Sequence, residues 1–241
     1  TVRFTGDEVA AIAAETEEQA EEALSLIQVE YEMLSAVFDP REAIREGAPI
    51  IHEGKEQNIA FSLNKTFGDP EKGFAEAAHI VEDSYVTQRA AHCTLETRGC
   101  IARWDRAGNN SRLTLWASTQ SPHTLKEEVA RTLDIDPKRI QVIKPATGGA
   151  FGNRMVMDMG LPVAAILAKK TGRPVKVANT RTDEFLISRT RYPYHIDLKT
   201  GVRADGRLTS RSVQIYVDSG AYTDTGSATL SVAGSMFAVL Y

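Results

Sequence analysis

The sequence predicts a mixed α/β (α+β) fold, and three observations support this prediction. Predicted strands alternate with predicted helices between residues 113 and 178, which is the pattern of βαβ units. Residues 195–203 and 208–218 predict a long hairpin, because a turn signal at Ala204-Asp205-Gly206 separates them. Of the 241 residues, 42% are hydrophobic and 25% are charged, so the chain can bury a sizeable core.

Composition argues against several classes of function. A net charge of −4 disfavours a nucleic-acid-binding surface, which needs a basic field. No apolar run is long enough to cross a bilayer, and the first residues lack the order of a signal peptide, so we expect a cytoplasmic protein. The spacing of Cys93 and Cys100 is not that of zinc or iron–sulfur ligands, and the sequence has no other cysteine. We expect two buried, reduced thiols.

Residues 1–38 form the first predicted segment, in the order strand–helix–strand. Residues 8–14 and 29–37 suit strands. Between them Thr16 can begin a helix as its N-cap, because Gln19 stands three residues later as in a capping box. A polar connector punctuated by proline and glycine follows at residues 39–70, with a short helix predicted inside it at 41–46.

Residues 71–241 form the second predicted segment. We expect helices at residues 71–78, 121–133 and 155–170, and strands at residues 80–87, 113–118, 140–143 and 175–178. Ser121 and Pro122 suit the start of the middle helix, whose buried stripe would be Leu125, Val129 and Leu133. The predicted stripe of the last helix is Val156, Met159, Val163, Ile166 and Leu167.

Two strand-to-helix junctions are candidates for chemistry, at residues 118–122 and 147–154. Ligands bind at this edge of open α/β structures, because free backbone N–H groups and helix dipoles face outward there. Gly148, Gly149 and Gly152 would let the backbone approach an anionic or oxo-bearing ligand. At the other junction the amide of Gln120 can donate to an oxygen while the scaffold holds its carbonyl. Both features also have a structural reading, a tight turn for the glycines and a surface or capping role for Gln120.

Several motifs in register resemble the xanthine dehydrogenase and aldehyde oxidase family, in its large molybdopterin-binding subunit. Residues 1–38 resemble the end of that family's α/β hammerhead domain, and residues 71–241 resemble the first part of its molybdopterin-binding domain. The motifs are Leu95-Glu96-Thr97, Ser118-Thr119-Gln120, Gly148-Gly149-Ala150-Phe151-Gly152, Thr171-Gly172-Arg173-Pro174-Val175-Lys176, Arg191-Tyr192-Pro193 and Asp218-Ser219-Gly220-Ala221-Tyr222.

The resemblance implies a cofactor site in this chain. Gln120 matches the glutamine that hydrogen-bonds an oxygen ligand of molybdenum. Phe151 and Gly152 match the pair beside the metal, and Gly149 and Ala150 belong to the same loop, with Ala150 where the family frequently has glycine. No side chain would ligate the metal directly, since the pterin holds it in this family, and this fits the scattered positions of the five histidines.

Glu96 would be a structural residue under the site, as an ion-pair or loop-fixing group. Phe151 and Met155 would line the substrate pocket. Purine-specific relatives place a glutamate where this chain has Met155, and an arginine near Gly234, so the resemblance argues against purine recognition of that type.

The implied reaction is oxidation of a small heterocycle, aromatic acid or aldehyde, with water as the oxygen source. The implied cofactors are a molybdenum–molybdopterin, in the cytosine dinucleotide form, with [2Fe-2S] and FAD on partner chains. The expected partners are the remaining molybdopterin-binding chain or segment, an iron–sulfur subunit and an FAD subunit. No catalytic residue is expected in this chain, since the general base would lie downstream or in a partner, and the chain alone should be inactive. The alternatives are a carbon monoxide dehydrogenase-like or aromatic acyl-CoA reductase-like subunit, and a non-catalytic scaffold of the same fold.

Overall fold

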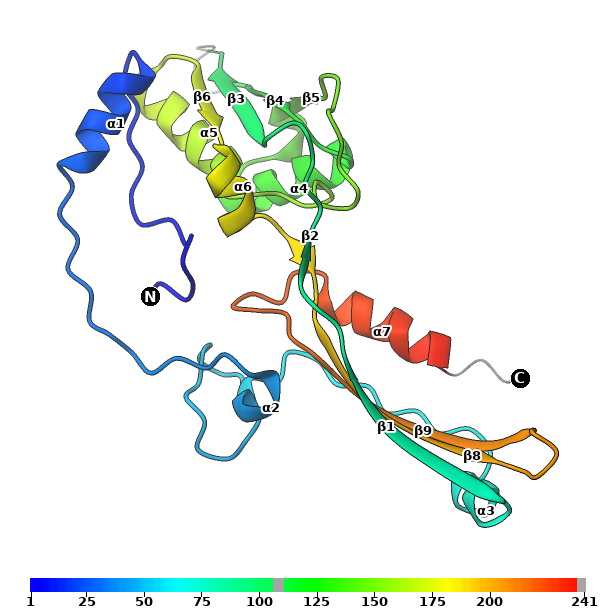
Figure 1. The fold of residues 1–241 in the computed structure, drawn as a ribbon. Coiled ribbons are helices and arrows are strands. Elements are labelled where there is room, and N and C mark those ends of the chain that lie inside the picture. The colour runs from blue at the N-terminus through cyan, green and yellow to red at the C-terminus, as the bar shows by residue number, and fades with distance from the viewer. Residues whose placement is uncertain (106–110, 238–241) are drawn as a thin grey trace. The chain divides into compact units, whose positions relative to one another are not determined.

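The chain contains both helices and strands, which alternate between residues 113 and 191, and this confirms the predicted α/β (α+β) class (Figure 1). The computed structural model describes residues 1–105 and 111–237. They group into two units. The first unit consists of Thr1–Tyr31 and Ala91–Thr190, and the second consists of Glu32–Ala90 with the chain from Arg191 onward.

The first unit contains a four-stranded mixed sheet in the order β5-β4-β3-β6. Its strands are β3 (Gly99–Trp104), β4 (Leu113–Ala117), β5 (Ile140–Ile143) and β6 (Val175–Ala178). Strands β4 and β5 are parallel, whereas β3 is antiparallel to both β4 and β6. The carboxyl ends of β4 and β5 therefore lie side by side at one edge of the sheet.

Helix α4 (Pro122–Leu133) connects β4 to β5, so a βαβ unit is present as predicted. Pro122 occupies the first turn, and Leu125 and Val129 are buried as expected. The capping role of Ser121 is wrong in its detail, because its side chain makes no capping hydrogen bond. Its backbone N–H instead donates to Thr119 Oγ1 at 3.1 Å.

Helix α5 (Gly160–Thr171) begins five residues later than predicted. Its N-terminus has no side-chain cap, and the N–H of Leu161 donates to the backbone carbonyl oxygen of Asp158 at 3.3 Å. The predicted stripe is also wrong, since Ile166 is 46% exposed while the buried face consists mainly of alanine. Small side chains let this helix lie close to the sheet, and an alanine face carries little hydrophobic signal in a sequence.

The core of the first unit lies between one face of the sheet and helices α4 and α5. Its fully buried large side chains come from β4 and α4, and alanines from α5 fill the space opposite β3. The buried members are Cys100, Ala102, Leu113, Leu115, Ala117, Leu125, Val129, Ala130, Ile140, Leu161, Ala164, Ala165 and Ala168. Because of this dense packing, the ends of β4 and β5 are held rigidly, and both candidate junctions begin at these ends.

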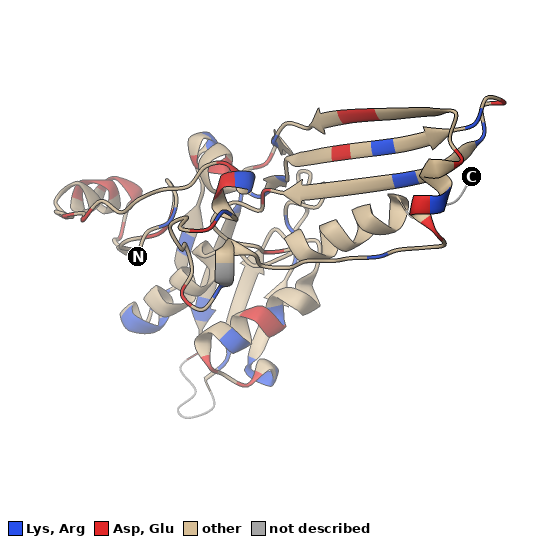
Figure 2. Ribbon diagram, turned by 90° about the horizontal axis from the view of Figure 1, so that it is seen from below, with Lys and Arg blue, Asp and Glu red and all other residues tan. Residues whose placement is uncertain are grey.

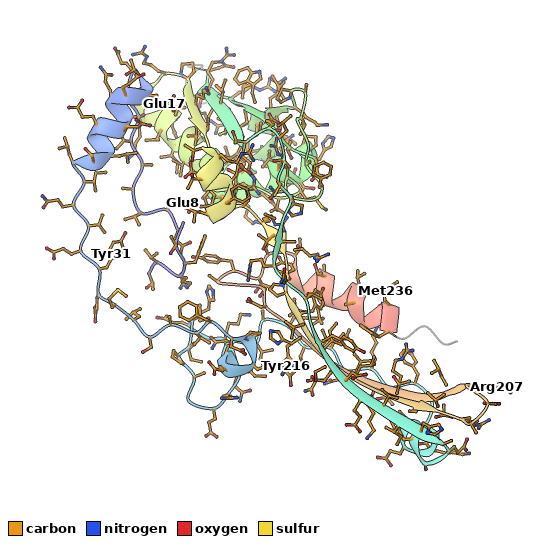
Figure 3. The ribbon with its side chains drawn as sticks, in the orientation of Figure 1. Glu8, Glu17, Tyr31, Arg207, Tyr216 and Met236 are labelled. Carbon is orange, nitrogen blue, oxygen red and sulfur yellow. The ribbon has the colours of Figure 1, made fainter. Side chains whose placement is uncertain are left out.

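Helix α1 (Glu17–Ser25) confirms the predicted N-terminal helix, with Thr16 Oγ1 accepting the N–H of Gln19 at 3.3 Å. The strands predicted at residues 8–14 and 29–37 are wrong, because no described strand pairs with either segment. An extended segment becomes a strand only where a partner satisfies its backbone groups. Figure 3 labels Glu8 and Tyr31 on these two segments, and Tyr31 is largely exposed.

The second unit contains a three-stranded antiparallel sheet in the order β1-β8-β9. Its strands are β1 (His79–Val86), β8 (Tyr194–Val202) and β9 (Leu208–Val217), so the long predicted hairpin is confirmed. Figure 2 shows acidic and basic residues intermixed on these strands. Lys199, for example, pairs with Glu82 across β8 and β1 at 2.7 Å.

Three helices of the second unit pack against β9. Helices α2 (Pro40–Ala43) and α3 (Pro70–Ala75) correspond to the two short predicted helices, and α7 (Gly226–Phe237) was not predicted. Strands β2 (Ala90–Ala91) and β7 (Thr190–Arg191) form a separate two-stranded sheet. None of the described helices has both the length and the apolar character that a membrane span requires.

Candidate functional site

The two junctions predicted to carry chemistry meet at the carboxyl edge of β4 and β5. Gln120, which follows β4, accepts two backbone N–H groups of the glycine-rich loop after β5 on its side-chain oxygen. The donors are Gly152, at 3.0 Å, and Arg154, at 3.2 Å. Residues 118–122 and 147–154 therefore form one site, held together by hydrogen bonds between the two segments.

The orientation of the Gln120 amide follows from these contacts. Because Oε1 faces two N–H donors, Nε2 must point away from them. Within the described chain Nε2 has no acceptor, and the side chain is exposed. Gln120 therefore presents an unused NH2 group at the edge of the sheet, with its carbonyl oxygen held by the scaffold.

The glycine-rich loop presents further unused donors. Gly148 donates its N–H to Glu96 Oε2 at 2.7 Å. The next three N–H groups, of Gly149, Ala150 and Phe151, have no acceptor among residues 1–105 and 111–237. Successive free N–H groups on one loop favour an anionic or oxygen-bearing ligand.

Each glycine of the loop is needed for a different physical reason. A Cβ on Gly148 would lie 2.6 Å from Glu96 Cβ, so this glycine makes room for the glutamate. Gly149 has φ +100°, and a Cβ there would lie 3.2 Å from the ring of Phe151. Gly152 has φ +92° and open space, with His92 Nε2 the nearest atom at 3.8 Å. A ligand can therefore approach the loop most closely over Gly152.

Phe151 and Met155, the residues predicted to line a substrate pocket, both lie exposed on this loop and the turn after it. Phe151 is 73% exposed and adopts φ +52°, which is uncommon for a bulky residue. Met155 is 47% exposed. Backbone strain of this kind concentrates at functional sites, and an exposed aromatic ring beside free donors is consistent with a ligand-facing position.

An ion pair between Glu96 and Arg154 lies beneath the loop. Arg154 NH1 is 2.5 Å from Glu96 Oε2. The Arg154 side chain is 1% exposed, and the Glu96 side chain is 36% exposed. Arg154 also donates to the carbonyl oxygen of Glu96 at 2.5 Å and to Ser118 Oγ. The predicted loop-fixing function of Glu96 agrees with these contacts, whereas the sequence did not single out Arg154.

The hydrogen bonds to Glu96 also shift its acidity. Burial alone would raise the pKa of this carboxyl, but the N–H of Gly148 and the side chains of Arg154 and Ser118 outweigh burial and lower the pKa. Glu96 is therefore ionised near neutral pH and already accepts several donors. A carboxylate in this state is a poor general base.

A second buried cluster, not foreseen from the sequence, supports the same loop. Arg98 donates its backbone N–H to Glu184 Oε1 at 2.6 Å, and its guanidinium donates to the carbonyl oxygen of Asn153 at 3.0 Å and to the Asn153 side chain. Burial raises the pKa of the nearby Asp158 carboxyl, and the charge of Arg98 opposes that shift. These residues fix the end of the loop to β3 and α6 (Arg181–Ile187).

The cysteines differ from the expectation of two buried thiols, because Cys93 is exposed while Cys100 is buried. Both are free thiols. No group of three or more His, Cys, Asp or Glu residues in the described chain could hold a metal ion.

Comparison with known families identifies both parts of the chain. Residues 51–241 match the molybdopterin cofactor-binding domain. Residues 1–35 match the α/β hammerhead domain of aldehyde oxidase and xanthine dehydrogenase. The two matches follow the order in which the resemblance placed these domains.

Individual relatives are similar over nearly the whole chain. A probable xanthine dehydrogenase subunit of Bacillus subtilis is 39% identical over 95% of this chain and 30% of its own length. The nicotinate dehydrogenase large molybdopterin subunit of Eubacterium barkeri is 34% identical over 96% of this chain and 53% of its own length. A solved carbon monoxide dehydrogenase of Oligotropha carboxidovorans has a TM-score of 0.75 at 26% identity, over 84% of this chain and 26% of that chain. The chain thus spans only part of the relatives that it matches.

Proposed function

This chain belongs to the xanthine dehydrogenase and aldehyde oxidase family, and on that premise we propose that it forms one wall of the molybdopterin site of a molybdenum-dependent hydroxylase. One observation carries the proposal: the free amide of Gln120 and the free N–H groups of residues 149–151 belong to two segments that hydrogen bonds hold together. We assign residues 1–38 to a partial hammerhead segment, 39–70 to a connector and 71–241 to the first part of the molybdopterin-binding domain.

The donor set fits such a group. A molybdenum–molybdopterin carries oxygen atoms that accept hydrogen bonds, and the loop offers neutral donors with no competing partner in the described chain. Gly152 leaves open space above the backbone for a close approach. When bound, the group would supply oxidation chemistry with water as the oxygen source.

The residues of this chain would orient the cofactor and enclose it, and they would transfer no protons. Gln120 would direct a hydrogen bond at an oxygen ligand of the metal, and Phe151 would exclude water beside it. Glu96 is excluded as the general base because its pKa is lowered and its oxygen accepts several donors. On this proposal the general base lies downstream in the subunit or in a partner chain.

The substrate class follows from Met155. A thioether accepts hydrogen bonds only weakly, so it offers a soft wall to a ring face and no partner for a purine N–H. We infer a small heterocycle, an aromatic acid or an aldehyde as substrate. The named activity of a nicotinate dehydrogenase subunit 34% identical to this chain supports a substrate of that size.

The finer assignments complete the proposal. The cofactor would be the cytosine dinucleotide form of molybdopterin, and [2Fe-2S] and FAD would lie on partner chains of a cytoplasmic complex. Those partners are the remaining molybdopterin-binding chain or segment, an iron–sulfur subunit and an FAD subunit. Relatives that are named as large subunits support an assembly of several chains.

A carbon monoxide dehydrogenase-like or aromatic acyl-CoA reductase-like subunit is the second candidate. A carbon monoxide dehydrogenase large chain of Hydrogenophaga pseudoflava, 29% identical over 97% of this chain, supports the first of these. A non-catalytic scaffold is disfavoured, because a scaffold has no need of a free amide aligned with free N–H groups.

Molybdenum and pterin analysis of the purified complex tests the proposal. We expect about one molybdenum and one pterin per assembled subunit, and none bound tightly to the 241-residue chain alone. Turnover should then be measured with xanthine, nicotinate, benzaldehyde and carbon monoxide. A complex without molybdenum or pterin would contradict the proposal, and turnover of carbon monoxide alone would favour the second candidate.

A further inference from the structure

The guanidinium of Arg154 is a buried charge whose NH1 and NH2 groups donate to acceptors on two segments, whereas Nε has no partner in the described chain. NH1 donates to Glu96 Oε2 at 2.5 Å and to Ser118 Oγ. NH2 donates to the carbonyl oxygen of Glu96 at 2.5 Å and to Thr94 Oγ1 at 3.5 Å. These acceptors replace the water that a charged group loses on burial, and a planar fork can reach them together where an ammonium cannot.

The backbone of the same residue holds Gln120. Its N–H donates to Gln120 Oε1 at 3.2 Å, and its carbonyl oxygen accepts the backbone N–H of Gln120 at 2.9 Å. The hydroxyl of Thr119 donates to that carbonyl oxygen as well, at 3.2 Å. Arg154 therefore fixes both the position and the plane of the Gln120 amide.

The other end of the loop is tied to the same carboxylate. Gly148 donates to the Glu96 oxygen that also accepts the Arg154 guanidinium. The free N–H groups of residues 149–151 lie between these two anchors. Their distance from the Gln120 amide is thus set by the Glu96–Arg154 pair.

We propose that Arg154, acting through Glu96, is a positioning residue that fixes the separation between the Gln120 amide and the free N–H groups of the loop. The inference rests on the proposed function, since both sets of donors are assigned there to the molybdopterin. A shift of about 1 Å in such a donor is enough to slow catalysis by roughly a hundredfold. Arg154→Lys keeps the charge but cannot reach all four acceptors, and Glu96→Gln keeps the shape but removes the charge.

The test uses the assembled complex with Arg154→Lys and, separately, Glu96→Gln. The matched controls are Arg203→Lys and Glu76→Gln, which alter an exposed ion pair with a similar N–O distance of 2.6 Å. Four quantities are measured: molybdenum content, the electron paramagnetic resonance spectrum after partial reduction, kcat and KM. We expect normal molybdenum content, a changed spectrum and a kcat about 10- to 100-fold lower, with KM within about twofold, in the site variants alone.

The experiment distinguishes failure of the positioning function of Arg154 from failure of the proposed function. If molybdenum is present but both site variants keep the wild-type spectrum and kcat, the positioning function of Arg154 is wrong and the proposed function stands. The same conclusion follows if activity falls only in proportion to molybdenum content, because that is the result of a purely structural contribution. If Arg154→Lys does not fold, Glu96→Gln decides by the same criteria. A wild-type complex without molybdenum would overturn the proposed function and this inference with it.

Discussion

Arg154 and Gln120 exchange two hydrogen bonds across the edge of the sheet. The backbone N–H of Gln120 donates to the Arg154 carbonyl oxygen at 2.9 Å, and the Arg154 N–H donates to Gln120 Oε1 at 3.2 Å. This reciprocal pair joins two junctions separated by 34 positions in sequence. It leaves the Gln120 amide as a fixed donor at this edge of the sheet.

Gln120→Ala should leave the fold intact and lower turnover of the assembled enzyme about 10²- to 10³-fold, because it removes a preorganised donor. The two N–H groups that it frees, of Gly152 and Arg154, lie beside exposed Gln120 and can be hydrated. Gln141→Ala is the control, since Gln141 is exposed on β5. Steady-state kinetics on molybdenum-replete protein checks the prediction, and equal rates for both variants would return Gln120 to a surface or capping function.

Gly148→Ala should destabilise the chain by about 1–3 kcal/mol through overpacking, because the new Cβ would meet Glu96 Cβ at 2.6 Å. It should also lower kcat of the molybdenum-replete complex, because relief of the contact moves Glu96 away from the loop. Gly206→Ala is the control: it adds strain at φ +88° in the β8–β9 turn, with nothing within 4 Å of the new Cβ. Thermal unfolding and steady-state kinetics on molybdenum-replete protein separate the two effects. Equal kcat in both variants would show that the position of Glu96 does not matter for turnover.

The two thiols should differ in reactivity. Burial, with the nearby negative charge of Asp158, raises the pKa of Cys100 to about 12, so its reactive thiolate is scarce at pH 8. Cys93 is exposed and should be alkylated first by iodoacetamide in the native state. Mass spectrometry of peptides after a short labelling time measures both. Equal labelling of the two sites without unfolding would contradict the burial of Cys100.

The Glu96 carboxylate should make stability depend on pH in the acid range. Its folded pKa is lowered, so its stabilisation is present above the unfolded pKa, near 4.5, and is lost as pH falls through the folded pKa. The melting temperature of the wild type should therefore exceed that of Glu96→Gln at neutral pH, and the gap should shrink below about pH 4. Solvent screening keeps the gap small. A gap that is constant down to pH 3 would show that the ion pair contributes nothing.

Local patterns in the sequence predicted the elements that bury large side chains or form tight turns. The β4–α4–β5 unit and the β8–β9 hairpin were predicted because their signals lie within about 30 residues. Helix α5 was placed too early because its start carries no side-chain cap, so no residue near Gly160 marks it in the sequence. Helix α7 was not predicted, because serine, glycine and alanine dominate it and give little periodicity.

For the candidate site too, some residues could be named from the sequence and others could not. The glycine-rich loop and Gln120 carry a recognisable pattern of residue types, so both could be named from the sequence. The supporting residues could not, because their partners are distant: Arg154 pairs with Glu96 across 58 positions, and the Arg98 backbone bonds Glu184 across 86. Only the sheet order brings these groups together.

A crystal structure of the assembled, cofactor-loaded complex would measure the distance from Gln120 Nε2 to the nearest oxygen ligand of molybdenum, and this distance tests directly whether Gln120 holds the cofactor. We expect a hydrogen-bond distance of about 2.7–3.2 Å, with the N–H groups of residues 149–151 facing the cofactor. A molybdenum centre whose oxygen ligands lie beyond about 4 Å from Nε2, or a cofactor bound away from this loop, would contradict the account.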